Sequence, residues 1–124
     1  MNRKFNIWGR EFDLQVMFGN FADNEAKPVQ KEALKTFLAN LHLIDECKSE
    51  VENYCLRKNA KEIGANTIDN IFKYVIPEAL YIENTHDNTH CVALVCAYKF
   101  DEENGIAVIF KNEAFCQVTT QSVL

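Results

Sequence analysis

Apolar and polar side chains alternate at the start of the chain, on both sides of Gly9. Successive side chains of a strand point to opposite faces, so this period of two predicts two half-buried strands joined near residues 9–11. Trp8 and Met17 fall on the nominally polar face, which indicates that this face is partly covered or forms a contact surface. The apolar positions of the two strands are Phe5, Ile7, Phe12, Leu14, Val16 and Phe18.

The middle of the chain changes to helical spacing. Apolar residues recur three and four positions apart, which places them on one face of a helix. Pro28 suits the first turn of the first helix, Gly64 suits the end of the second, and Pro77 ends the third. The pattern therefore predicts three helices in succession. Their apolar stripes run from Val29 to Leu41, from Ile44 to Cys55 and from Ile68 to Ile76.

The last part of the chain returns to strand patterns. Residues 91–97 are apolar at every position, which is typical of a central strand covered on both faces. Residues 98–115 indicate strand, acidic turn, strand, tight turn and strand, with Gly105 supplying the positive φ of the first turn. We therefore expect a single α+β domain over residues 1–124. An antiparallel sheet, made of the N-terminal hairpin and a C-terminal meander, carries about three helices inserted between them and packed on one face.

The composition is that of an ordinary globular domain, with 48% hydrophobic and 25% charged residues. No apolar run approaches the roughly 20 residues that cross a bilayer, and the first residues lack the apolar core of a signal peptide. We therefore expect a cytoplasmic protein without a membrane segment. The five cysteines are odd in number, scattered and mostly on apolar faces, which favours reduced thiols over a disulfide framework.

Candidate catalytic chemistry is sparse. His86, His90 and Cys91 form the one cluster of metal-ligand types, but zinc needs three or four converging ligands, so a solvated loop is the favoured interpretation. Cys91 begins an apolar strand and lacks the electropositive setting that activates a thiolate. The chain has neither a phosphate-binding glycine loop nor a nucleophile elbow. We expect no catalytic residue, metal or cofactor, and a small hydrolase using the loop from His86 to His90 is the enzymatic alternative.

The net charge of −5 argues against binding of nucleic acid through a broad basic face, and it suits a basic protein partner. Acidic side chains gather on the second predicted helix and on the acidic turn, and Trp8 is a candidate aromatic anchor. The alternative is that these acidic residues have no partner-binding role. Those on the helix then form a solvated face in which the early acids complement the helix dipole, and those on the turn are ordinary surface residues. The candidate partner-binding residues are Asp45, Glu46, Glu50, Glu52, Asp101, Glu102, Glu103 and Trp8.

The C-terminal hairpin resembles that of a group of small uncharacterised bacterial cytosolic domains. The likeness rests on Tyr98-x-Phe100-Asp101-x-Glu103-x-Gly105-x-Ala107-x-Ile109-Phe110-x-Asn112-Glu113-x-Phe115 and on the ending Gln121-Ser122-Val123-Leu124. It extends more loosely to the opening hairpin and to residues 70–77. Some of these domains are encoded near polymorphic toxin or contact-dependent inhibition systems, so the resemblance implies an immunity-type role.

These observations lead to two hypotheses for function. The first is a non-enzymatic immunity protein of the contact-dependent growth inhibition type, which neutralises a cognate toxin by direct binding and occlusion. We expect that toxin to be basic, with nucleases among the candidates, because proteins that act on nucleic acid carry positive faces. The second is a self-associating structural or regulatory domain, such as a homodimer formed through the sheet, motivated by the apolar strand at residues 91–97 and by Trp8 and Met17.

Overall fold

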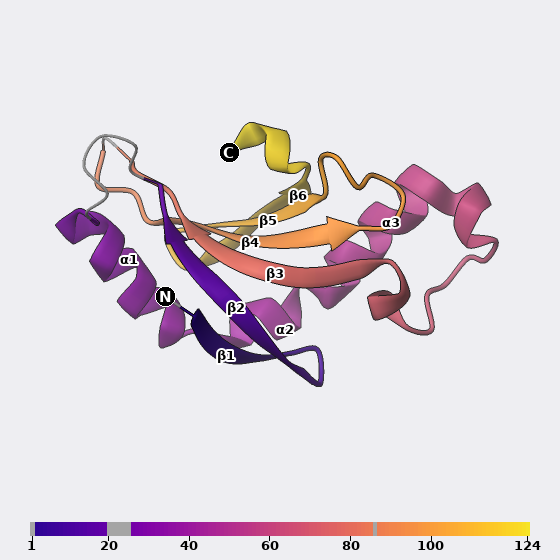
Figure 1. The fold of residues 1–124 in the computed structure, drawn as a ribbon, viewed down its shortest axis with the longest axis horizontal. Coiled ribbons are helices and arrows are strands. Elements are labelled where there is room, and N and C mark those ends of the chain that lie inside the picture. Colours follow the sequence, from indigo (N-terminus) through magenta and orange to yellow (C-terminus); the bar gives the residue numbers. More distant parts are fainter. Residues whose placement is uncertain (1, 20–25, 86) are drawn as a thin grey trace.

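A six-stranded sheet carries all three helices on one of its faces in the computed structural model, which describes residues 2–19, 26–85 and 87–124 (Figure 1). The strands follow one another across the sheet in chain order. The predicted α+β class is confirmed, with an N-terminal hairpin, inserted helices and a C-terminal meander. The elements are β1 (Asn2–Ile7), β2 (Arg10–Phe18), α1 (Pro28–Leu38), α2 (His42–Glu46), α3 (Lys48–Ile63), the 3-10 turn η1 (Ile71–Lys73), β3 (Val75–Ile82), β4 (Cys91–Tyr98), β5 (Ile106–Lys111), β6 (Ala114–Thr119) and the 3-10 turn η2 (Gln121–Val123).

The sheet is mixed, because β2 and β3 run parallel while the other four neighbouring pairs are antiparallel. Parallel neighbours need a long crossover connection, and the helical segment between β2 and β3 provides it. This segment returns the chain to the end of the sheet at which β2 began. The expected antiparallel pairing therefore holds within the N-terminal hairpin and within the C-terminal meander, and it changes where the two meet.

The prediction of a helix over residues 68–76 is wrong. This region forms only the short turn η1 before β3 begins at Val75 and runs through Pro77. Val75 and Ile76 are β-branched and suit a pleated strand. The strand register shifts between Pro77 and Ala79, and such an irregularity accommodates a proline that has no N–H to donate.

The second predicted helix, over residues 44–64, is divided in two at Cys47. The break leaves α2 and α3 as separate helices, so the number of helices agrees with the prediction although their boundaries differ. The thiol of Cys47 donates a hydrogen bond to the Ile44 carbonyl oxygen at 3.1 Å. Gly64 ends α3 in the left-handed conformation, as predicted, and its N–H donates to the Ala60 carbonyl oxygen.

The main core lies between the helices and the sheet, where the rings of Phe37 and Phe110 lie 5.1 Å apart. The other face of the sheet carries a smaller buried cluster that includes Ala93 and Ala107. Strand β4 contributes to both clusters, which confirms the prediction of a central strand covered on both faces. No helix in the described ranges is long and apolar enough to cross a membrane.

Candidate functional site: a groove between the α2–α3 junction and β6

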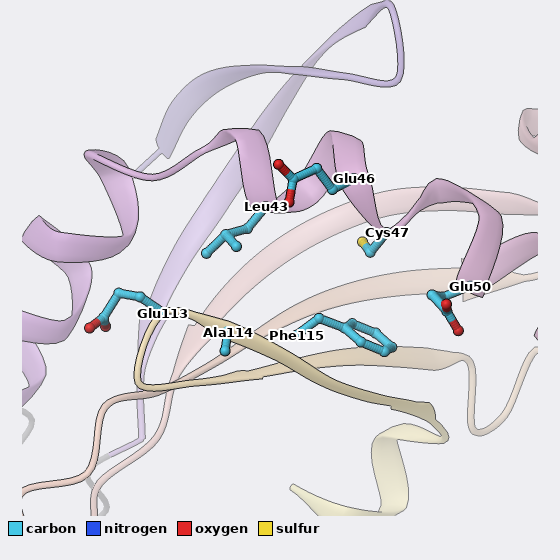
Figure 2. A pocket seen from close by; sticks show the side chains of 7 residues that line it. All are labelled: Leu43, Glu46, Cys47, Glu50, Glu113, Ala114 and Phe115. Atoms are coloured by element: carbon cyan, nitrogen blue, oxygen red, sulfur yellow. The ribbon is translucent and has the colours of Figure 1, made fainter.

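A groove of about 320 Å³ lies between the α2–α3 junction and the start of β6, which is an edge strand (Figure 2). Its two sides come from distant parts of the sequence, one helical and one from the C-terminal hairpin. Apolar groups form part of its lining, and three carboxylates lie among them. The lining residues are Leu43, Glu46, Cys47, Glu50, Glu113, Ala114 and Phe115.

The helical side of the groove follows from sequence spacing. Glu46 and Cys47 follow Leu43 by three and four positions, and Glu50 follows them by four and three. The four residues therefore share one side of the helical segment even though it is broken between α2 and α3. Leu43 is half-buried and Cys47 is buried. Burial raises the pKa of the Cys47 thiol to about 12, so the thiol stays neutral and contributes an apolar surface.

The strand side of the groove begins at a tight turn. Asn112 and Glu113 both have positive φ, 48° and 60°, as a two-residue hairpin turn of the right twist requires. The Asn112 side chain accepts a hydrogen bond from the backbone N–H of His90 at 3.0 Å, and the Asn112 N–H donates to the His90 carbonyl oxygen at 2.8 Å. The turn is thereby fixed to the residue before β4, and the predicted tight turn is confirmed.

Phe115 brings an exposed aromatic ring to the groove. Its side chain packs edge-on against Phe110 with the ring centroids 6.3 Å apart, yet 36% of the residue stays exposed. Exposure of apolar surface to water is unfavourable, so burial of the remaining surface of Phe115 by a partner would lower the free energy of the complex. The groove therefore combines an apolar contact with a negative lining.

The electrostatic balance of the groove is negative. Glu46 and Glu50 are exposed, and neither forms an ion pair with any described residue. Glu113 lies 2.8 Å from the imidazole of His90, which satisfies it in part. A cationic group in the groove would meet two carboxylates, Glu46 and Glu50, that have no positive neighbour within ion-pair distance in the described part of the chain.

The predicted partner-binding residues of the helices separate in the structure. Glu46 and Glu50 line the groove, whereas Glu52 is half-buried elsewhere on α3. Asp45 is exposed, and its Oδ1 accepts a hydrogen bond from the Trp8 backbone N–H at 3.3 Å. The helix thus contributes part of the predicted acidic set to one surface.

The acidic turn between β4 and β5 lies at a different place. Asp101 is half-buried and accepts a hydrogen bond from the Asn104 backbone N–H at 3.1 Å, while Glu102 and Glu103 are exposed. Asp101 borders a second cavity, of about 250 Å³, together with Lys58 near the basic end of α3. The turn and the groove therefore do not form one acidic surface.

The alternation predicted that Trp8 lies on the polar face of the hairpin, and the structure places it elsewhere. Its φ of 51° breaks the alternation at the turn, and its indole N–H donates to the Ile44 carbonyl oxygen at 2.8 Å. The ring lies 6.1 Å from that of Phe72. Trp8 therefore joins the β1–β2 turn to α2, whereas Met17 is 40% exposed on the face of the sheet opposite the helices.

Five of the seven groove residues were not predicted from the sequence: Leu43, Cys47, Glu113, Ala114 and Phe115. In the sequence the last three belong to the tight turn and final strand of the C-terminal hairpin pattern. The available signal was the Asn112–Glu113 pair, because a two-residue turn fixes which face the following side chains occupy. Nothing local indicated that this face meets the α2–α3 junction.

The alternative catalytic loop is described only in part, because His86 lies outside the described residues. His90 is engaged by Glu113. Burial, aided by the nearby carboxylate of Glu83, raises the pKa of Cys91 to about 12, so this thiol stays protonated near neutral pH. Within the described residues there is no group of three or more side chains suited to holding a metal ion.

Fold and groove together define an α+β domain with a mixed sheet and an acidic groove at one sheet edge. All of residues 1–124 match the model of a family described as a domain of unknown function (DUF6985), and the chain belongs to that family. The search of curated proteins and the search of solved structures each returned no match. The expectation that the chain resembles domains of unknown function is therefore confirmed.

Proposed function

We propose that this domain is a non-enzymatic binding protein, an immunity protein that neutralises a cognate basic toxin by direct binding and occlusion. The observation that carries the proposal is the groove, where Glu46 and Glu50 have no ion-pair partner among the described residues and lie beside the exposed ring of Phe115. The cytoplasmic location expected from the sequence is part of the proposal.

Charge complementarity supports a basic partner. Like the groove, the whole chain is negative, with a net charge of −5, and this field accelerates encounter with a positive surface. A toxin that acts on nucleic acid must attract phosphates, so its active-site face is positive. Because surface charges are screened by salt, the association rate is expected to fall as ionic strength rises.

Phe115 is a better candidate anchor than Trp8. The most energetic contacts in protein interfaces come from aromatic side chains that become fully desolvated on binding. Phe115 still exposes 36% of its surface, whereas the indole N–H of Trp8 is already bonded to the Ile44 carbonyl oxygen. The proposal therefore places the centre of the interface at the groove.

Co-expression with each protein encoded beside the gene tests the proposal. We expect one of them to arrest growth alone, and the wild-type domain to restore growth and to co-purify with it. The double variant E46Q/E50Q is expected to weaken both effects, and the matched variant E102Q/E103Q, on the acidic turn, is expected to keep them. If no neighbouring protein is toxic or bound, the proposal is overturned.

A second candidate function, self-association through the sheet, is favoured by one observation. Met17 and Ile76 are each 40% exposed on the face of the sheet opposite the helices. Exposed apolar side chains on a sheet face are available for contact with another copy of the chain. Light scattering at high protein concentration decides between the two, since a strict monomer removes this candidate.

A further inference from the structure

We infer that the outer edge of β6 binds an extended segment of the partner as an added strand, with the cationic side chains at every second position of that segment entering the groove. The inference rests on the proposed binding role and specifies its geometry. The partner segment is then a strand or hairpin rich in lysine or arginine. The added strand extends the sheet by one position beyond β6, alongside the α2–α3 junction.

The edge strand β6 is open to such an addition. It pairs with β5 on one side, and no strand lies beyond it within the described residues. In an antiparallel pair, alternate residues direct their N–H and C=O groups away from the partner strand, and these groups are ready to pair with another chain. The first four residues of β6 are all exposed, so this edge is uncovered.

The two edges of the sheet are protected to different degrees. The opposite edge strand, β1, carries Arg3 and Lys4, and charged side chains are a usual means of discouraging added strands. Strand β6 has neither a charged residue nor a proline. Its one irregularity is a register shift opposite Ile109 and Phe110. Of the two edges, β6 is therefore the one without charged side chains, and its register shift leaves regular pairs on both sides, at Ala114 and Phe115 and from Gln117 to Thr119.

The register of β6 determines which guest side chains reach the groove. Phe115 pairs with Phe110, whose side chain belongs to the core between sheet and helices, so Phe115 marks the helix-facing side of β6. Every second side chain of an added strand points to that same side. Those side chains would lie beside Phe115 and opposite Glu46 and Glu50, as the arrangement in Figure 2 indicates.

Lysine and arginine fit these positions best. Their aliphatic stems can cover an apolar surface while the charged head reaches a polar rim. In the groove the stem would contact Leu43 and Phe115, and the head would approach Glu46 or Glu50. Valine or isoleucine at the intervening positions gives the guest segment its own preference for a strand.

A second copy of this chain is a poorer occupant. Pairing two β6 edges would supply uncharged side chains to both grooves, because β6 carries no cationic residue. It would also bring Glu46 and Glu50 of each copy toward the other, and like charges repel at close distance. The charge pattern thus selects a basic partner over self-pairing.

Three synthetic peptides of about nine residues, long enough to span the six residues of β6, test the inference. The first alternates lysine and valine, the second alternates glutamate and valine, and the third repeats the first with N-methyl groups along one edge. We expect the first to bind at least about tenfold more tightly than the other two, because N-methylation removes the backbone donors while keeping the charge. Hydrogen exchange should slow at residues 114–119 of the wild-type protein.

Each outcome of this experiment has a defined meaning. Equal affinity for the N-methylated peptide, or protection confined to β1, overturns the inference, and so does a free protein that already dimerises through β6. E46Q/E50Q should weaken binding of the lysine peptide about fivefold while β6 protection persists at saturation. If a toxin is neutralised but β6 stays unprotected in the complex, the edge inference fails and the proposed function stands. If the lysine peptide protects β6 but the domain neutralises no toxin, the edge inference stands and the proposed function fails.

Discussion

The imidazole Nδ1 of His90 lies 2.8 Å from Oε2 of Glu113, so the residue before β4 is tied to the turn between β5 and β6. The two side chains are 20% and 25% exposed, which reduces the screening of their interaction by water. The contact holds the third carboxylate of the groove against the start of β4. Glu113 is thus at once a lining residue of the groove and a part of the hairpin turn.

Replacing Glu113 separates these two roles. Its φ of 60° is left-handed, and this conformation costs a residue with a Cβ about 1 kcal/mol relative to glycine. Both E113G and E113A lose the contact with His90, so we expect E113G to be the more stable by about 1 kcal/mol in urea unfolding. Equal stabilities would mean that the turn gives up its positive φ when the side chain is removed.

Gln30 is completely buried and connects α1 to the sheet. Its amide nitrogen donates to the carbonyl oxygens of Gly19 at 3.1 Å and Ile82 at 3.2 Å, and its Oε1 accepts from the Lys27 N–H at 2.8 Å. Q30M keeps the volume of the side chain but leaves buried polar groups without this partner. We expect it to lower the free energy of unfolding by about 2 kcal/mol.

The control for Gln30 is Q15M, at an exposed position on β2. Exposed substitutions of this kind usually change stability by less than about 0.5 kcal/mol. Chemical unfolding followed by the fluorescence of the single tryptophan measures both variants in the same way. A loss of stability for Q15M as large as that for Q30M would contradict the role assigned to the buried amide.

Local periodicity was enough to predict most of the fold. The alternation in β1 and β2 and the apolar run of β4 depend on burial of one or both strand faces, and both are visible in sequence. The failure at residues 68–76 has a physical origin. The apolar spacing in this segment is that of a helix, at Ile68, Ile71, Phe72 and Val75. From Val75 onward, however, the chain forms β3, which pairs with β2 on one side and β4 on the other. This strand pairing overrides the local helical spacing.

Of the candidate site, the sequence predicted only the residues whose charge and helical spacing mark them as a surface face. Glu46 and Glu50 stood out because charges on a helix face can be read from spacing. Phe115 and Glu113 did not, since their pattern indicates a turn followed by a strand and nothing more. The groove itself depends on contact between α2–α3 and β6, which are far apart in sequence, and no local pattern contains that contact.

The five cysteines should differ sharply in reactivity. Cys116 is exposed, whereas the other four are buried. In the native protein we expect a thiol-specific reagent to modify one cysteine quickly, and all five only after unfolding. C116S should abolish the fast reaction. A fast reaction that persists in C116S would show that a buried thiol is accessible through local opening of the fold.

Alkaline pH should destabilise the fold through its buried thiols. Burial raises the pKa of Cys91 from 9.0 to about 12 and that of Cys55 from 9.0 to about 11, so the folded state holds these protons more tightly than the unfolded state. Below pH 9 both states are protonated and this contribution to stability is fully present. As pH rises above 9 the unfolded state releases the protons first, so the free energy of unfolding falls by up to about 1.4 kcal/mol per pH unit for each thiol. The fall ends near pH 11 for Cys55 and near pH 12 for Cys91. Urea unfolding under reducing conditions should show a shallower decline for C91A than for the wild type, and identical slopes would contradict this assignment.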